Sequence, residues 1–99
     1  MTVFHTVIGE APEVIYTCDL EMTGDWRKWR VGPSTEVLRP AFDFEGADIA
    51  PAPSAVGAID ERVNQLRDPD IFIDDDGAVY MPYGIAGEAG IAIAQMFPI

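Results

Sequence analysis

Cysteine, histidine and basic side chains are scarce in this sequence of 99 residues, and each shortage excludes a kind of site. Cys18 is the only cysteine, so no disulfide can form within the chain, and its apolar surroundings predict a buried, unreactive thiol. His5 is the only histidine and has no partner at metal-ligand spacing. The acidic run 74–77 does not form a calcium loop, because Phe72 and Tyr83 stand where oxygen ligands are needed. The sequence therefore predicts no metal and no cofactor.

Six basic residues face seventeen acidic ones, which gives a formal charge of −11. This balance argues against nucleic acid and anionic membrane surfaces as partners, because both attract basic patches. It is compatible with simple solubility and also with an acidic cleft that binds carbohydrate. No apolar run approaches membrane-spanning length, and no basic segment followed by an apolar core opens the chain. We expect a soluble chain without a secretion signal in these residues, and its localisation stays open.

The segment 66–96 predicts a meander of three short antiparallel strands. An Asp-Gly pair between alternating apolar residues is a strong hairpin signal, because glycine readily adopts the left-handed backbone of such turns and aspartate tolerates it. The sequence DDDG at 74–77 therefore predicts the first turn, and the glycine-rich bend 84–90 predicts the second. The expected strands are residues 71–73, 79–83 and 90–95.

The chain before this meander predicts further strands and then a long irregular segment. The expected strands are residues 2–8, 14–20 and 37–39. Pro40 suits the end of an edge strand, since proline cannot donate to an interior ladder. Trp26 and Trp29 are spaced for a short helical turn, and packing in a core or between blades is a better interpretation for them than a sugar-stacking platform. Residues 41–65 lack periodicity, and a loop of this length is often functional.

The order of these motifs resembles a blade of the five-bladed β-propeller glycoside hydrolases of the family 43 type. The resemblance depends on Arg67-Asp68-Pro69, the strand and DDDG turn after it, and the sequences YMPYG at 80–84 and GIAIA at 90–94. It extends upstream through 14–20 and the tryptophan pair. It implies an all-β fold of antiparallel blade-like meanders with one long irregular loop. The implied parts are the end of one blade at 2–40, an inter-blade loop at 41–65, and the first three strands of the next blade at 66–96.

A whole propeller needs at least four four-stranded blades, so the resemblance implies a C-terminal segment of a larger protein. A free-standing β domain with blade-like hairpins is the alternative. The resemblance further implies a glycoside hydrolase that acts on plant or algal polysaccharides or oligosaccharides, with carbohydrate as its partner. Because the chemistry needs carboxylates from several blades, we expect the segment alone to be inactive. A non-catalytic carbohydrate-binding or scaffold segment is the second interpretation.

The residues to which the resemblance assigns roles lie in the long loop and at the Arg-Asp-Pro step. Asp68 matches a catalytic aspartate and Glu45 the acid's Glu-Gly context, although Glu45 lies in a loop. The candidates for substrate binding are Arg67, Phe42, Phe44 and Asp48. The structural alternatives are a strand-capping carboxylate for Asp68 and, for Arg67, an ion pair with Asp68, Asp70 or Glu45. Because Asp68 precedes a proline, we expect an extended backbone there and close approach of the loop.

Overall fold

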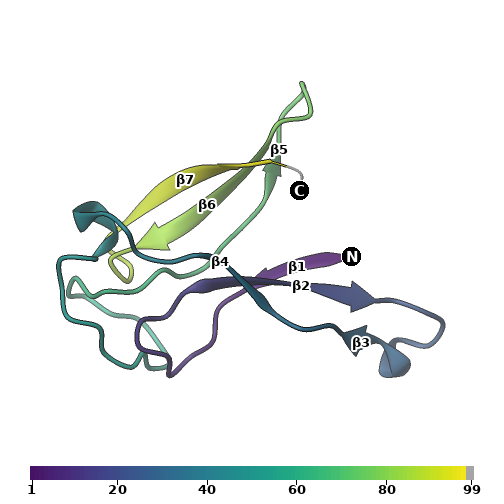
Figure 1. Ribbon diagram of the computed structural model, residues 1–99, viewed down its shortest axis with the longest axis horizontal. Helices are drawn as coiled ribbons and strands as arrows, with labels where there is room; N and C mark the ends of the chain where they lie inside the picture. Colours follow the sequence, from purple (N-terminus) through teal and green to yellow (C-terminus); the bar gives the residue numbers. More distant parts are fainter. Residues whose placement is uncertain (98–99) are drawn as a thin grey trace.

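A computed structural model describes residues 1–97, which form two small antiparallel sheets (Figure 1). The predicted all-β architecture is confirmed at this level. Within these residues the only helical turns are two short 3-10 segments, η1 (Trp26–Lys28) and η2 (Asp43–Glu45). No helix in the described part of the chain is long and apolar enough to cross a membrane.

The first sheet is built around its longest strand, β2. Its strands are β1 (Thr2–His5), β2 (Ile15–Glu21), β3 (Arg30–Val31) and β4 (Thr35–Leu38). β1 and β4 both pair with Tyr16 and Thr17 of β2, so they occupy opposite edges. Ile15 pairs with Leu38 but Tyr16 pairs with Glu36, which leaves one extra residue on β4 and makes a bulge there. The strand predicted at 2–8 ends earlier, at His5. The strand predicted at 37–39 begins earlier, at Thr35, and β3 was not predicted.

The second sheet agrees closely with the predicted meander. Its strands are β5 (Phe72–Ile73), β6 (Val79–Ile85) and β7 (Gly90–Met96), in that spatial order. The DDDG hairpin is confirmed: the backbone N–H of Asp74 donates to Ala78 at 2.8 Å, and that of Gly77 donates to Asp74 at 2.9 Å. Gly77 has a φ of 86°, the left-handed conformation for which glycine was expected.

Residues 65–67 join the two sheets into one core. Leu66 donates its backbone N–H to Glu13, next to the first sheet, at 2.9 Å. Arg67 exchanges two backbone hydrogen bonds with Gly84 of β6, at 3.1 and 2.7 Å. The Leu66 side chain is therefore held between the sheets. The fully or largely buried cluster there consists of Ile15, Leu66, Met81 and Tyr83.

The long loop 41–65 is irregular, as predicted, but it is anchored to both sheets. Its residue Ser54 donates a backbone N–H to Glu10 and accepts one from Gly9 at its hydroxyl. Gly46 follows η2 with a φ of 96°, and a Cβ added there would lie 2.2 Å from the carbonyl oxygen of Val63. A side chain at this position would collide with the backbone, which explains the glycine.

Cys18 is buried, as predicted, but the tryptophans are not. η1 confirms the short helical turn, which Asp25 caps by accepting the N–H of Arg27. Trp26 is 71% exposed and Trp29 40%, so neither packs in a core formed by residues 1–97. β3, beside them in the chain, lies at the end of the first sheet farthest from β5–β7 (Figure 1). Packing between blades stays a prediction.

One face of the second sheet and the edge strand β7 are uncovered in residues 1–97. Phe72 and Tyr80 lie side by side on this face, 6.5 Å apart at their ring centroids. Ile91 and Ile93 of β7 continue the same face and are exposed. β7 carries no charged residue, and uncharged apolar edge strands pair readily with other chains. We therefore expect the chain to associate with itself through exposed strand edges, with β7 as the site of contact.

We expect Ile93→Lys to reduce concentration-dependent association, because a lysine on an exposed edge strand opposes strand pairing. Sedimentation velocity over a range of chain concentrations measures this change. Val56→Lys adds the same charge at an exposed site in the loop and serves as the control. A wild-type chain that stays a monodisperse monomer at high concentration would contradict the prediction.

Candidate functional site

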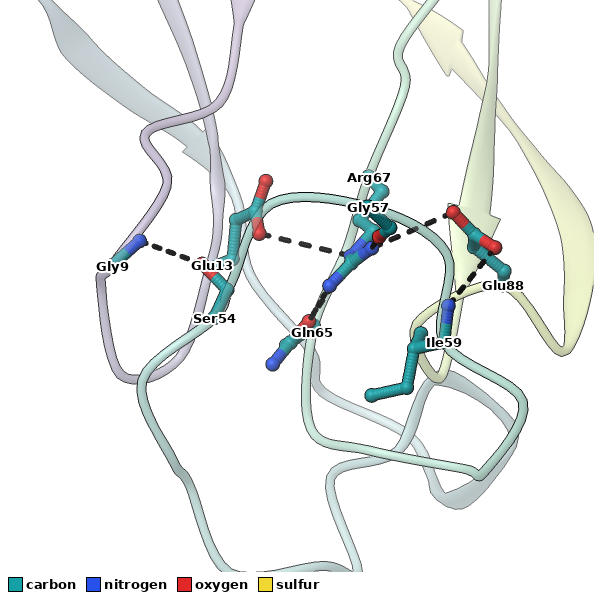
Figure 2. Close-up of polar contacts among 8 residues, drawn as sticks. All are labelled: Gly9, Glu13, Ser54, Gly57, Ile59, Gln65, Arg67 and Glu88. Carbon is teal, nitrogen blue, oxygen red and sulfur yellow. Dashed lines mark hydrogen bonds and ion pairs between the residues drawn. The ribbon is translucent and has the colours of Figure 1, made fainter.

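Arg67 is buried where the two sheets meet, and its guanidinium has several partners (Figure 2). Its Nε and Nη2 donate to the side-chain oxygen of Gln65 at 3.1 and 2.8 Å. Its Nη1 donates to the carbonyl oxygen of Gly57 at 3.0 Å. The long loop and the strand segment thus fix the guanidinium in one orientation.

Two carboxylates flank this guanidinium from opposite sides (Figure 2). The Glu13 carboxylate lies 3.8 Å from Nε, and the Glu88 carboxylate lies 3.5 Å from Nη1. The ion pairs of Arg67 in residues 1–97 are therefore with Glu13 and Glu88, and not with Asp68, Asp70 or Glu45 as the sequence suggested. The sequence carries no local signal for these partners, because Glu13 and Glu88 are brought to Arg67 only by the packing of the two sheets.

Asp68 has a left-handed backbone with a φ of 50°, so the expectation of an extended conformation is wrong. The register of the neighbouring strand gives the reason. Arg67 is hydrogen-bonded to Gly84, and the backbone N–H of Asp70 donates to the carbonyl oxygen of Pro82. Asp70 lies three residues after Arg67, whereas Pro82 lies only two residues before Gly84. The extra residue makes a bulge, and it forces Asp68 into a conformation that non-glycine residues seldom adopt. Pairing with β6 outweighs the preference imposed by Pro69.

The exposed side chain of Asp68 lies between two pockets. One, of about 350 Å³, extends over the second sheet and is lined by residues that include Asp70, Pro82 and Ile91. The other, of about 250 Å³, lies between the sheets and the long loop, with Arg67 in its lining. The long loop approaches Arg67 and Asp68 as expected, since Ala55 and Gly57 also line the second pocket. Asp68 is thus available to a ligand from two sides.

Glu45 is 1% exposed and lies against the second sheet. Its Oε1 accepts the backbone N–H groups of Ala41 and Phe42 at 3.0 and 3.3 Å, and its Oε2 accepts the hydroxyl of Tyr83 at 2.7 Å. Both oxygens are therefore occupied by protein donors. These contacts favour a structural role, in which Glu45 fixes the start of η2 to β6.

The other loop residues predicted to bind substrate gather around η2. Phe42 and Phe44 are exposed and stack on each other, with ring centroids 5.3 Å apart. Asp48 pairs with Arg62 at 3.2 Å. None of these residues, nor Glu45, lines either pocket that contains Asp68. The structure therefore divides the predicted site into two groups, with Arg67 and Asp68 in one and the four loop residues in the other.

The buried hydroxyl of Tyr83 predicts how the stability of the chain depends on pH. Burial, and the hydrogen bond to Glu45, raise the pKa of Tyr83 well above its usual value of 10.0. Above pH 10 the unfolded chain releases this proton while the folded chain keeps it, so stability falls as pH rises. We expect the loss in the free energy of unfolding to approach about 1.4 kcal/mol per pH unit once the pH is about one unit or more above the pKa of the unfolded tyrosine. Urea unfolding between pH 9 and 11 measures the slope. Tyr83→Phe should show a smaller slope, and equal slopes would contradict the assignment.

The chain is 43% identical over 95 residues to the uncharacterised protein R118 of Acanthamoeba polyphaga mimivirus. The similarity covers 95% of this chain but only 26% of that protein, so the chain spans about a quarter of the length of this relative. No family model matches the sequence, and no solved structure matches it. No cluster of three or more potential metal-ligating side chains is present in the described residues.

Proposed function

We propose that this chain is a segment of a β-propeller glycoside hydrolase, similar to family 43, that acts on plant or algal poly- or oligosaccharides. The observation that carries the proposal is Asp68. Its carboxylate is exposed between two pockets, follows the buried Arg67 directly, and sits on a backbone conformation that costs energy. Such conformations persist where the surrounding structure enforces them and often occur at functional sites.

The arrangement of the strands supports the same proposal. β1, β2 and β4 form one antiparallel meander, and β5, β6 and β7 form a second. The segment 65–67 ends the long loop and pairs with β6 at the start of the second meander. This order suits the end of one blade followed by the first strands of the next, with the divisions 2–40, 41–65 and 66–96. The structure itself shows two antiparallel sheets, and their assignment to blades of a propeller is part of the proposal.

Hydrolysis of a glycosidic bond needs two carboxyl groups, one as acid and one as base or nucleophile. Asp68 is an exposed carboxylate that lines two pockets, so in this proposal it is the base or a neighbour of the acid. Glu45 is enclosed and bonded to three donors, so the acid would come from outside this segment. The segment alone is accordingly inactive in this proposal.

The test uses the complete reading frame in which this sequence lies, assayed on a panel of aryl glycosides and plant oligosaccharides. Asp68→Asn should lower kcat by about 100-fold or more, the usual contribution of an acid–base group. Asp75→Asn removes the same charge from the exposed hairpin turn and should leave kcat unchanged. Equal activity of wild type and Asp68→Asn would overturn the catalytic assignment.

A non-catalytic carbohydrate-binding segment is the second candidate, and the engagement of Glu45 by three protein donors favours it. In this case Asp68 and Arg67 would hold sugar hydroxyls without reaction. Binding of an oligosaccharide that is weakened by Asp68→Asn, with no turnover by the complete protein, would identify this function instead.

A further inference from the structure

We propose that the groove between the two sheets binds a neutral, mainly apolar molecule that carries a hydroxyl group. The groove has a volume of about 790 Å³, which is within the usual range for ligand sites. It lies where β1 begins and β7 ends, on the side of the molecule where the two sheets diverge (Figure 1). None of its lining residues belongs to the two pockets beside Asp68, so this inference is independent of the proposed carbohydrate function.

The walls of the groove are sheet faces and not strand edges. Phe4 and Thr17 are cross-strand partners in the first sheet, so their side chains share one face, and both line the groove. Val79 and Met96, which are partners in the second sheet, also line it. Phe4 and Met96 pack in addition against the buried cluster around Leu66. The groove is therefore continuous with the core, and an apolar molecule bound there would extend that core.

The bulge of β4 adds an apolar side chain to the groove. Val37 is the extra residue of this bulge, because its neighbours Glu36 and Leu38 pair with successive residues of β2. Bulges often redirect a side chain, and Val37 lines the groove. The irregularity of β4 thus contributes directly to the apolar lining.

The side chain of Thr17 points to a ligand. Its hydroxyl oxygen is buried and has no hydrogen-bond partner among residues 1–97. Buried hydroxyls normally have a partner, because an unpaired polar atom away from water costs free energy. Since Thr17 lines the groove, a bound molecule can supply this partner. A hydroxyl group suits the position because it both donates and accepts hydrogen bonds, as threonine does.

The charge and the backbone of the lining exclude other occupants. Of the described residues that line the groove, Asp19 alone is charged, so an anion would be repelled. Asp19 is exposed and already accepts the hydroxyl of Thr2 at 3.4 Å, so it would add little to the binding of a cation. A strand from another protein or from a second copy would bring backbone N–H and C=O groups, which sheet faces cannot pair.

The experiment titrates the ¹⁵N-labelled chain with decanol and with decanoate, and follows the amides of the groove by NMR. We expect decanol to bind at least about tenfold more tightly than decanoate, because burial of the carboxylate beside Asp19 is unfavourable. Thr17→Val should weaken decanol binding by about fivefold, the factor that corresponds to one neutral hydrogen bond. It should also raise the urea midpoint of the free chain, because it removes the unpaired hydroxyl.

Thr23→Val is the matched control, since it makes the same change at an exposed position beyond the end of β2. It should alter neither decanol binding nor the urea midpoint. Val37→Trp fills the groove and should abolish decanol binding, whereas Val56→Trp at an exposed loop position should not. Should Val37→Trp fail to fold, Val79→Trp fills the groove from the second sheet and replaces it.

Three results would overturn the inference. The first is that neither compound shifts the amides of the groove, or that both bind equally tightly. The second is equal binding of decanol by the wild type and by Thr17→Val. The third is that Val37→Trp abolishes self-association of the chain while decanol does not bind, which would make the groove a contact between two copies.

Discussion

Leu66→Ala is expected to lower the free energy of unfolding by about 3 kcal/mol, as for other leucines truncated in a core. Leu66 is 0% exposed and packs with Ile15 of the first sheet and with Met81 and Tyr83 of the second. Its removal would leave a cavity that both sheets line. Because neither sheet can move without breaking the backbone hydrogen bonds of residues 65–67, the cavity would not close fully.

Urea unfolding followed by circular dichroism measures this loss. Ile91→Ala truncates another large aliphatic side chain, but one that is 77% exposed on β7, and it should change stability by no more than about 0.5 kcal/mol. A loss for Leu66→Ala that equals the loss for Ile91→Ala would show that the two sheets do not share a core.

Glu45→Ala is expected to be similarly destabilising, by about 2–4 kcal/mol, because unmet buried donors cost about 1–3 kcal/mol each. The substitution leaves the hydroxyl of Tyr83 and the N–H groups of Ala41 and Phe42 without their acceptor. The start of η2 and its contact with β6 would be lost together. The structural role of Glu45 predicts this result even if the segment has no catalytic function.

Glu61→Ala serves as the control for Glu45→Ala, because Glu61 is an exposed glutamate of the same loop. It should be nearly neutral in urea unfolding. Glu45→Gln keeps one oxygen acceptor, so it should fall between the wild type and Glu45→Ala. If Glu45→Ala were as stable as the wild type, the hydrogen bonds of Glu45 would not support the loop.

The local parts of the fold could be predicted from the sequence. The DDDG turn, the strands β6 and β7 and the irregular loop depend on turn chemistry and on alternation of apolar residues, which act between near neighbours. The buried thiol of Cys18 follows from the same alternation. β3 escaped prediction because a strand of two residues has no period to detect, and β4 was misplaced because its bulge breaks the alternation.

The candidate site was predictable only in part. The Arg-Asp-Pro step drew attention to Arg67 and Asp68, and the structure places both at one pocket. The burial of Glu45 was not predictable, because its partner Tyr83 lies on a strand 38 residues away and the sequence does not say which loop covers that strand. The exposure of Trp26 was not predicted either, because the preference of tryptophan for buried positions does not say which segments of the chain lie outside the core.

The sequence by itself determined the β class, the meander 66–96 and its turns, because each depends on residues close together in the chain. Only the tertiary structure decided the partners of Arg67, the left-handed conformation of Asp68 and the burial of Glu13 beside Arg67. These features arise where residues 65–67 contact Glu13 on one side and β6 on the other. The register of that contact is set by the packing of two sheets, and side chains distant in sequence meet there only after both sheets have formed.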